Sequence, residues 1–382
     1  MLLERVLMPY DRRSPFVQRA TLFEDFVIRC VRWAFANLDP NVGRIFFSKY
    51  ISIPFLRFRM ARHGYFRPPV SWREVAEDGP RGHKGIWIEK DACRNPDVVI
   101  YYAHGGGFAM GSSYFYLEFL LSWHALLAQH YDNPAIFALE YTLVPDEKYP
   151  VQVYETLGGY KRVLRAVNGD PHKIVVAGDS AGGTLMLSML IEQGLMNGSK
   201  SFPNPNGLRE GPPGTQGQEL RRSASETPPP ELCVLISPWT KLISRQHKNT
   251  ESDYLDHTTL WKYGLKYAGS ASTQNWAVSP GLCKDMDLWA HSSPRGGFFI
   301  TYGSEEVFAP EIEELLTKLS GCTKVESSKE VGGIHAWPVV SLFLSSARQQ
   351  RLKGLESLTS AVKKSIQRQS TSMEGKNQSR SD

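Results

Sequence analysis

The feature that most restricts the fold is an alternation of strand-like and helix-like segments that begins near residue 84. Unbroken apolar runs such as DVVIYYA (97–103), KIVVA (173–177) and ELCVLI (231–236) are separated by stretches with helical periodicity, for example 151–167. Strands that are apolar throughout are typical of a parallel sheet whose two faces are both covered by helices. The sequence therefore predicts an α/β fold with a mostly parallel central sheet.

Other segments lie outside this alternation. Residues 1–75 look helical and aromatic-rich without an early strand, and residues 245–290 carry aromatic side chains with little strand character. The segment 197–230 contains NPNG, EGPPGTQGQ and TPPP, a composition with too little apolar area to offset the entropy of an ordered chain. We therefore expect a core over 84–345 with a disordered insert at 197–230, a helix over 346–366 and a disordered tail over 367–382.

The motif GDSAGG (178–183) stands directly after an apolar strand and directly before a helical stretch. Gly178 and Gly182 keep the flanks of the turn small, so a sharp turn can lift the Ser180 hydroxyl above the edge of the sheet. The start of the next helix supplies backbone N–H groups where negative charge would develop. A bare G-x-S-x-G also occurs in ordinary connecting turns, but the strand before it and the helix after it favour a nucleophilic serine.

A second glycine-rich motif, HGGGF (104–108), follows the strand VVIYYA. Consecutive glycines let backbone N–H groups approach a tetrahedral intermediate without obstruction by side chains. We expect the amides of Gly106 and Gly107 to form an oxyanion hole together with the amide of Ala181. His104 is expected to brace the loop through a hydrogen bond rather than to act as the base. A phosphate-binding loop is less suitable, because no GK[ST] follows.

A nucleophilic serine needs a base and an acid that orients the base. His335 lies in GGIHAWP (332–338), a glycine-flanked loop late in the chain, and is the expected base. The stretch YGSEEVF (302–308) places two carboxylates, Glu305 and Glu306, on a loop between a strand and a helix. The order serine, acid, histidine is that of one known hydrolase architecture, and either glutamate can serve as the acid.

These motifs together resemble the hormone-sensitive-lipase branch of the α/β-hydrolase fold, which includes arylacetamide deacetylases, bacterial esterases and fungal steryl acetyl hydrolases. The resemblance covers roughly residues 84–345 and also includes EYTLVPDEKYPVQVYE (140–155) and SPW (237–239). The usual acid of that branch is Asp, within D-x-L-R-D, whereas this chain has Glu. Matching E-V-F-A-P-E to that pattern selects Glu306, whereas counting from the end of the strand could select Glu305. The resemblance further implies that residues 1–75 and 245–290 form a helical cap whose aromatics line a pocket, with Trp239 as a candidate substrate-binding residue.

Composition excludes several other classes of function. The net charge of +5 comes without a dense Lys/Arg cluster interleaved with aromatics, so we expect no nucleic-acid partner. The five cysteines are scattered without a CxxC pair, which indicates neither a disulfide framework nor a metal site. The apolar stretch 23–38 is too short and too charged to cross a bilayer. We expect a cytoplasmic protein; attachment of its basic N-terminal helices to a membrane surface and its oligomeric state are left open.

The sequence therefore predicts an esterase that hydrolyses a hydrophobic small-molecule ester with an acetyl or short acyl group. Ser180, His335 and Glu306 would form an acyl-enzyme without any metal or organic cofactor. Two alternatives stay open. One is acyl transfer to an acceptor other than water, or elimination, at the same site; the other is a ligand-binding protein that kept this fold without turnover.

Overall fold

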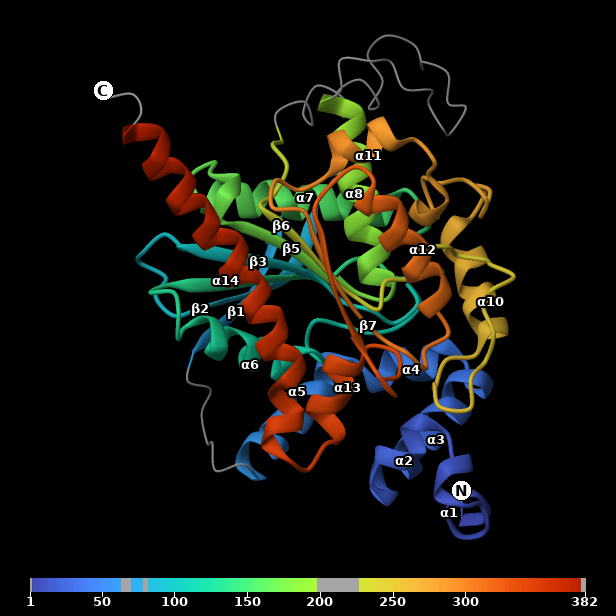
Figure 1. Ribbon diagram of the computed structural model, residues 1–382. Coiled ribbons are helices and arrows are strands. Elements are labelled where there is room, and N and C mark those ends of the chain that lie inside the picture. Colours follow the sequence, from blue (N-terminus) through green and yellow to red (C-terminus); the bar gives the residue numbers. More distant parts are fainter. Residues whose placement is uncertain (1, 63–69, 78–81, 198–226, 379–382) are drawn as a thin grey trace.

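The centre of the molecule is an eight-stranded sheet with helices on both faces (Figure 1). The computed structural model describes residues 2–62, 70–77, 82–197 and 227–378. Strand β2 is antiparallel to both of its neighbours, and all other pairs are parallel. The predicted α/β fold with a mostly parallel sheet is confirmed. In sheet order the strands are β1 (Ser71–Glu77), β2 (His83–Glu89), β4 (Pro134–Leu139), β3 (Val98–Ala103), β5 (Ile174–Asp179), β6 (Leu232–Ile236), β7 (Phe298–Gly303) and β8 (Val325–Glu330).

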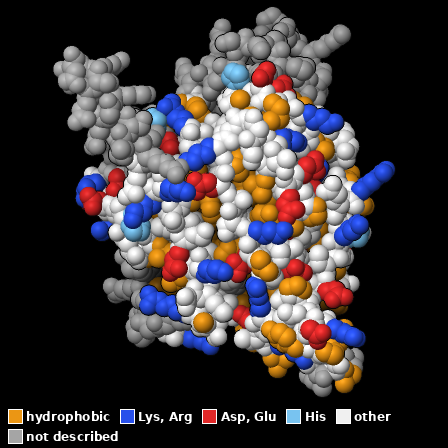
Figure 2. All heavy atoms as spheres, in the orientation of Figure 1, with side chains coloured by type: hydrophobic (Ala, Val, Ile, Leu, Met, Phe, Trp, Pro, Cys, Tyr) orange, Lys and Arg blue, Asp and Glu red, His pale blue; other side chains and the backbone are white. Residues whose placement is uncertain are grey.

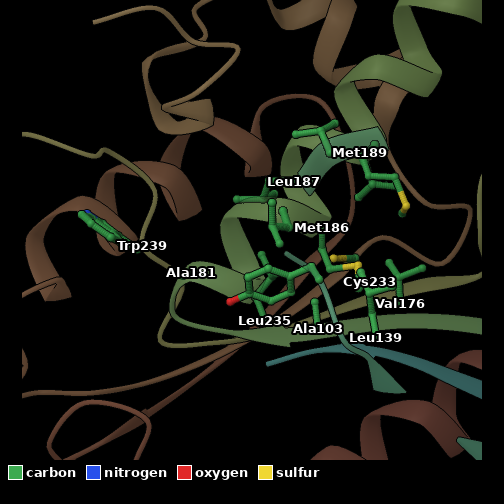
Figure 3. Close-up of a cluster of buried hydrophobic side chains, with 14 of the residues drawn as sticks. Ala103, Leu139, Val176, Ala181, Met186, Leu187, Met189, Cys233, Leu235 and Trp239 are labelled. Carbon is green, nitrogen blue, oxygen red and sulfur yellow. The ribbon is translucent and has the colours of Figure 1, made fainter. Parts of the chain in front are cut away.

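Each face of the sheet has its own hydrophobic core. Alternate residues of β3 divide between the two: Val99 and Tyr101 belong to one cluster, and Val98 and Ile100 to the other. Because both faces are covered, a strand such as β3 is apolar at every position. Figure 3 shows part of the first core, where side chains of α8 lie against strand residues such as Val176. The first core is covered by α7 (Val151–Ala166), α8 (Ala181–Asn197), α11 (Met286–Ser292) and α12 (Ala309–Ser320), and the second by α6 (Leu117–Leu127), α13 (Trp337–Leu344) and α14 (Arg348–Gln378).

The N-terminal helices lie along the lower side of the molecule in Figure 1. The longest, α3, starts with a capping box in which Thr21 and Glu24 satisfy each other's backbone N–H groups. It packs against α10, where the rings of Phe35 and Tyr263 meet edge to face at 5.8 Å. The helices concerned are α1 (Leu2–Leu7), α2 (Pro15–Arg19), α3 (Leu22–Asn37), α4 (Pro40–Phe46), α5 (Lys49–Arg62) and α10 (His257–Ala268); the 3-10 helices are η1 (Tyr10–Arg12), η2 (Pro171–Lys173) and η3 (Pro280–Leu282).

Among the helices of the described residues, none has both the length and the hydropathy needed to span a membrane.

Two boundaries differ from the sequence-based expectation. Strand β1 begins at Ser71, inside the segment 1–75 that was expected to lack an early strand; it is an edge strand in which only Val75 is buried, so its apolar pattern is weak. Helix α14 continues to Gln378, past residue 367, where a disordered tail was expected, because a polar sequence without proline can still form a helix. Most of the expected insert, 198–226, lies outside the described residues.

Candidate active site

The turn that carries Ser180 joins the carboxyl end of β5 to the first residue of α8. Ser180 has a φ of 51°, a left-handed conformation that costs free energy for a residue with a side chain. A Cβ atom on Gly178 would lie 2.6 Å from the carbonyl carbon of Gly182, and one on Gly182 would lie 2.0 Å from the carbonyl oxygen of Ala103. The two glycines of G-x-S-x-G are therefore required by close backbone contacts. The turn is held by the bonds Ser180 N–H to Ile236 O (3.0 Å) and Trp239 N–H to Ser180 O (3.0 Å).

The glycine loop lies at the adjacent carboxyl end of β3 and is fastened to this turn by Asp179. Oδ1 of Asp179 accepts hydrogen bonds from the Gly105 amide (2.8 Å) and the Tyr102 hydroxyl (2.7 Å), and Oδ2 accepts one from the Tyr116 hydroxyl (2.6 Å). Burial raises the pKa of this carboxyl to about 6. Sequence analysis did not assign Asp179 a role, although its place beside Ser180 in the motif is a usable signal.

Gly106 and Gly107 adopt φ values of +112° and +63°, which only glycine tolerates easily. Within the described part of the chain, the backbone N–H groups of Gly106, Gly107 and Ala181 donate to no protein acceptor. A hydrogen-bond donor in a buried site without an acceptor is costly, unless a ligand supplies one. These amides are therefore the ones available to an oxyanion.

His104 is engaged within its own loop. Its Nδ1 donates to the carbonyl oxygen of Gly105 (2.7 Å), and its ring stacks on Tyr141 with 4.4 Å between centroids. The Tyr141 hydroxyl in turn donates to the His104 carbonyl oxygen (2.9 Å). Burial lowers the pKa of His104 to about 4, so the ring is neutral at pH 7. The geometry fits a brace for the loop, as the sequence indicated.

His335 lies on the loop between β8 and α13 and is 2% exposed. Its ring contacts Phe308 edge to face (5.2 Å between centroids) and Tyr254 (5.8 Å). Burial lowers the pKa of His335 to about 3, which keeps the imidazole neutral. Its Nδ1 atom is buried and has no hydrogen-bond partner among the described residues.

Glu306 lies on the loop after β7 and is 2% exposed. Its Oε2 accepts hydrogen bonds from the Ser237 hydroxyl (2.6 Å) and the Gly303 amide (2.9 Å), whereas Oε1 is buried without a partner among the described residues. Burial raises the pKa of this carboxyl well above its usual value. Glu305, by contrast, is only partly buried, and its Oε1 accepts from the Ser304 hydroxyl. The structure thus directs Glu306, rather than Glu305, into the interior.

Ser237 connects the acid loop to the histidine loop. Its hydroxyl donates to Glu306 and accepts a hydrogen bond from the backbone N–H of Ala336 (2.9 Å), the residue after His335. Ala336 has a φ of 50°, so the chain turns sharply at this point. Ser237 therefore sets the position of both loops at once.

Asp253 makes a second connection between the same two loops, and sequence analysis missed it. Its Oδ1 accepts from the backbone N–H groups of His335 (3.1 Å) and Tyr254 (2.8 Å), and its Oδ2 accepts from that of Val307 (2.9 Å). The side chain is fully buried, and burial raises its pKa to about 6. No motif surrounds Asp253 in the segment 245–290, so only its contacts reveal it.

Tyr254 lies where the loops of Ser180, Glu306 and His335 meet, and its ring contacts that of His335. Burial raises its pKa well above 10, and the negative charges of Asp179 and Glu306 both add to that shift. Ser180, Glu306 and His335 each follow the carboxyl end of one of the strands β5, β7 and β8, which run parallel in one part of the sheet. The structure thereby brings the elements that carry Ser180, Glu306 and His335 to the same edge of the sheet.

Trp239, the candidate substrate-binding residue, is fully buried beside the site. Its ring stacks on Phe308 (5.7 Å between centroids) and contacts Phe108 (5.6 Å), and its Nε1 has no acceptor among the described residues. In Figure 3 it stands apart from the side chains that pack under α8. Trp239 thus fills the space between the glycine loop and the acid loop, and its contact with a substrate stays a prediction.

The site is closed in this structure. Ser180 is 4% exposed, and a surface cavity of about 280 Å³ lies elsewhere, lined by Arg73, Trp87, Arg162, Arg165 and Ala166. In the part of the chain that the structure describes, no three His, Cys, Asp or Glu side chains come together as metal ligands.

Comparisons with known proteins agree with this architecture. A family model described as alpha/beta hydrolase fold matches residues 100–339. A putative steryl acetyl hydrolase of Schizosaccharomyces pombe is 25% identical over 277 residues, covering 69% of this chain and 64% of that protein. Steryl acetyl hydrolase 1 of Saccharomyces cerevisiae is 22% identical over 269 residues, covering 64% of this chain and 55% of that protein. The chain thus spans less than two thirds of the length of both yeast relatives.

Solved structures show the same fold. A hormone-sensitive-lipase homologue from a metagenome library superimposes with a TM-score of 0.63 at 18% identity, over 91% of this chain and 100% of that one. An esterase from the bacterial hormone-sensitive lipase family gives a TM-score of 0.64 at 19% identity, over 91% and 99% of the two chains. The resemblance to hormone-sensitive-lipase-like hydrolases is confirmed. Because the family model matches more than half of its length, the chain belongs to the alpha/beta hydrolase fold family.

Proposed function

We propose that this protein hydrolyses carboxylic esters through a nucleophilic Ser180, with His335 as the base and Glu306 as the acid. The observation that supports this most strongly is the strained turn at Ser180, with a φ of 51°, directly beside amides that have no protein acceptor. Strain of this kind persists only where the surrounding structure enforces it, and it concentrates at functional sites. A connecting turn without a function needs neither the strain nor the uncommitted donors.

In the first step, the imidazole of His335 removes the Ser180 hydroxyl proton while Oγ bonds to the ester carbonyl carbon. The carbonyl oxygen becomes an oxyanion held by the amides of Gly106, Gly107 and Ala181. Collapse of this intermediate breaks the bond to the alcohol oxygen, which takes the proton from His335 and leaves. Water then attacks the acyl-serine with the same proton transfers, and the carboxylic acid and free Ser180 are released.

Two unpartnered buried atoms support the proposal that Glu306 orients the base. Its free Oε1 and the free Nδ1 of His335 are the two atoms that a Glu–His hydrogen bond would pair, and both are buried without partners among the described residues. A hydrogen bond between the two would satisfy both groups and remove the cost of two unpaired buried atoms. The imidazolium formed during catalysis would then favour the ionised carboxylate and offset the effect of burial on its pKa.

The substrate we propose is an uncharged hydrophobic ester with an acetyl or short acyl group. Aromatic rings enclose the site, including Tyr254 and Phe308 against His335, and the carboxylates Asp179, Asp253 and Glu306 are all buried. The yeast relatives are named as steryl acetyl hydrolases, and a Streptomyces hygroscopicus relative, 26% identical over 262 residues, as an acetyl-hydrolase. Trp239 would contribute to the wall of the pocket once substrate enters.

The test is hydrolysis of p-nitrophenyl acetate by the full chain and by Ser180→Ala. We expect kcat to fall by about 10⁴-fold or more in Ser180→Ala, as for other triads. The partly exposed Ser341 supplies a matched control, and Ser341→Ala should keep its rate. A fluorophosphonate probe should label the wild-type protein and Ser341→Ala but not Ser180→Ala. Equal turnover by Ser180→Ala and wild type would disprove the proposal.

The alternative reactions give different products. Hydrolysis yields only the free acid and the alcohol, even when a competing alcohol or amine is present. Acyl transfer would yield a new ester or amide, and elimination would yield an alkene. A binding protein would bind the ester, but it would form no product and would not be labelled by the probe. Product analysis by mass spectrometry separates these outcomes.

A further inference from the structure

The N-terminal helices expose most of the large apolar side chains on the surface of the molecule. Of the 19 exposed large hydrophobic residues in the described part of the chain, 16 lie between Leu7 and Phe58. Figure 2 shows hydrophobic side chains gathered at the lower right, over α1–α3. Soluble monomers seldom expose an apolar area this concentrated, and such areas mark binding to a partner or a membrane.

The exposed side chains follow helical periodicity, so they form continuous faces. In α3 the exposed positions include Phe23, Phe26, Cys30 and Trp33, at spacings of three and four residues. Phe23, Phe26 and Trp33 are 61%, 54% and 61% exposed. In α5 the corresponding face is formed by Ile51, Phe55, Phe58 and Arg62. Residues three and four apart lie on one side of a helix, so each helix presents an apolar face to its surroundings.

The inward side of α3 carries a buried carboxylate, Asp25, as well as the apolar Ile28. Asp25 is 1% exposed and receives hydrogen bonds from Arg5 (2.8 Å) and Arg29 (2.7 Å). Although burial opposes ionisation, these two guanidinium groups lower the pKa of Asp25 below its usual value. The helix thus differs from an ordinary surface helix, because ion pairs lie on its inner side while Phe23, Phe26 and Trp33 are exposed to solvent.

The net charge of the N-terminal helices favours an anionic lipid surface as the partner. Residues 1–62 contain 11 Lys or Arg and 5 Asp or Glu, a net charge of +6, whereas the whole chain carries +5. Arg12, Arg19, Arg57 and Arg62 are exposed among the apolar side chains. A symmetric contact with a second copy would bring these like charges together, because the same patch faces itself across a two-fold axis. An anionic lipid surface neutralises them and accepts the aromatic side chains at its headgroup boundary.

We propose that helices α1–α5 form a docking face that binds the protein peripherally to the surface of an anionic lipid bilayer. The apolar faces of α3 and α5 would enter the headgroup layer, and the exposed arginines would contact lipid phosphates. Binding is reversible and needs no membrane-spanning segment.

The docking face is backed by the candidate active site. Nη2 of Arg32, on the inner side of α3, donates to the carbonyl oxygen of Glu251 (2.6 Å), and its positive charge acts on Asp253, which holds the His335 backbone. Docking would therefore place the triad next to the lipid layer in which a hydrophobic ester dissolves. This consequence, unlike docking itself, rests on the proposed esterase function.

The test is flotation of the purified full chain with vesicles of phosphatidylcholine alone and with added phosphatidylglycerol. We expect binding to the anionic vesicles, and binding at least about tenfold weaker for Phe26→Ser/Trp33→Ser. Leu265→Ser/Met286→Ser is the control, since these exposed apolar residues (56% and 38%) lie outside α1–α5, and it should bind like wild type. Arg57→Gln/Arg62→Gln should lose about fivefold per charge on anionic vesicles only.

Phe55→Ser/Phe58→Ser on α5 gives an independent second variant in case the α3 variant does not fold, as judged by circular dichroism. Wild-type protein that floats with neither vesicle, or α3 and α5 variants that bind like wild type, would overturn the proposal. A dimer in light scattering that the α3 variant converts to monomer, without lipid binding, would assign the face to a second copy.

Ser180→Ala should still bind vesicles, so loss of esterase activity and loss of docking are distinguishable. The inference that docking brings the triad next to the lipid layer has its own test. Hydrolysis of a vesicle-embedded ester should fall in the α3 variant, while turnover of p-nitrophenyl acetate should be unchanged.

Discussion

Helices α8 and α3 are similar in length, 17 and 16 residues, but α8 is apolar on its buried side, whereas α3 buries a carboxylate and exposes aromatic side chains. In α8, Leu185, Met186 and Leu187 are fully buried, and the helix starts directly after Ser180, the proposed nucleophile. In α3 the buried residues are Asp25 and Ile28, and Phe23, Phe26 and Trp33 point outward. Hydrophobic burial therefore dominates the packing of α8, whereas capping and ion pairs contribute more to that of α3, the helix of the proposed docking face. We therefore expect the exposed aromatic side chains of α3 to contribute little to folding stability.

The largest effect on activity is expected from a substitution in the interior that replaces a single heavy atom of a side chain. We expect Glu306→Gln to lower kcat for p-nitrophenyl acetate by about 10⁴-fold, because an amide can hold the wrong tautomer of His335 and cannot stabilise its imidazolium. Glu305→Gln, its neighbour on the loop, should stay within about twofold, and so should Phe26→Ser/Trp33→Ser on α3. A large loss in Glu305→Gln with none in Glu306→Gln would exchange their roles.

A matched pair of truncations sharpens the contrast between the two helices. Leu187→Ala in α8 should lower the free energy of unfolding by about 2–5 kcal/mol, because it leaves a cavity in a closed core. Phe26→Ala in α3 should change it by less than about 0.5 kcal/mol, since the side chain is largely in solvent. Urea unfolding measures both. A cost in Phe26→Ala as large as that in Leu187→Ala would show that α3 packs its aromatics after all.

Asp253 links the two regions, and its removal should affect both stability and rate. In Asp253→Asn one of the accepting oxygens becomes an NH₂ group that faces a backbone N–H, at a cost of about 1–3 kcal/mol in unfolding free energy. Displacement of the His335 loop should also lower kcat by about 100-fold. Asp256→Asn, which changes the N-cap of α10, is the control and should leave kcat unchanged. Normal kcat in folded Asp253→Asn would exclude a positioning role.

The smallest expected effect is a pH dependence carried by His104. Its pKa is about 4 in the folded state and about 6.5 when unfolded, so the unfolded chain binds the extra proton as the pH falls below 6.5. Folding stability from this group is therefore lost towards acid pH, by about 1 kcal/mol between pH 7 and 5.5. Comparing urea unfolding of wild type and His104→Gln at both pH values isolates the term. An identical pH dependence in the two proteins would show that His104 is not buried as a neutral ring.

The sequence was sufficient to predict the sheet and the local motifs, because both depend on short-range patterns. Unbroken apolar strands and the glycines around Ser180 have direct steric causes that are visible in the sequence itself. Edge strand β1 escaped prediction because only Val75 is buried in it. The carboxylate Asp253 escaped because its role comes from backbone groups of His335 and Val307, 82 and 54 residues away. Long-range hydrogen bonds to the main chain leave no trace in the pattern of side chains.

The outward orientation of the aromatic side chains of α3 could not be predicted from periodicity either. The pattern of Phe23, Phe26 and Trp33 is equally compatible with a helix that packs these side chains inward, which is the usual arrangement. Only the burial of Asp25 between Arg5 and Arg29 reveals the orientation. Glu306 and Glu305 were separated for a similar reason, since only the fold shows which carboxylate points inward.

The Asp253 contacts have a consequence for how such enzymes can be re-engineered. The segment 245–290 carries α10, which packs against α3. It also supplies Asp253, which accepts hydrogen bonds from the backbone of His335, the proposed base, and of Val307, the residue after the proposed acid. Exchanging this segment for that of a relative, in order to change substrate range, would also remove a support of the catalytic loops. A segment exchange that changes selectivity in this chain would therefore also affect turnover. If the new segment lacks an equivalent of Asp253, we expect a lower rate for every substrate.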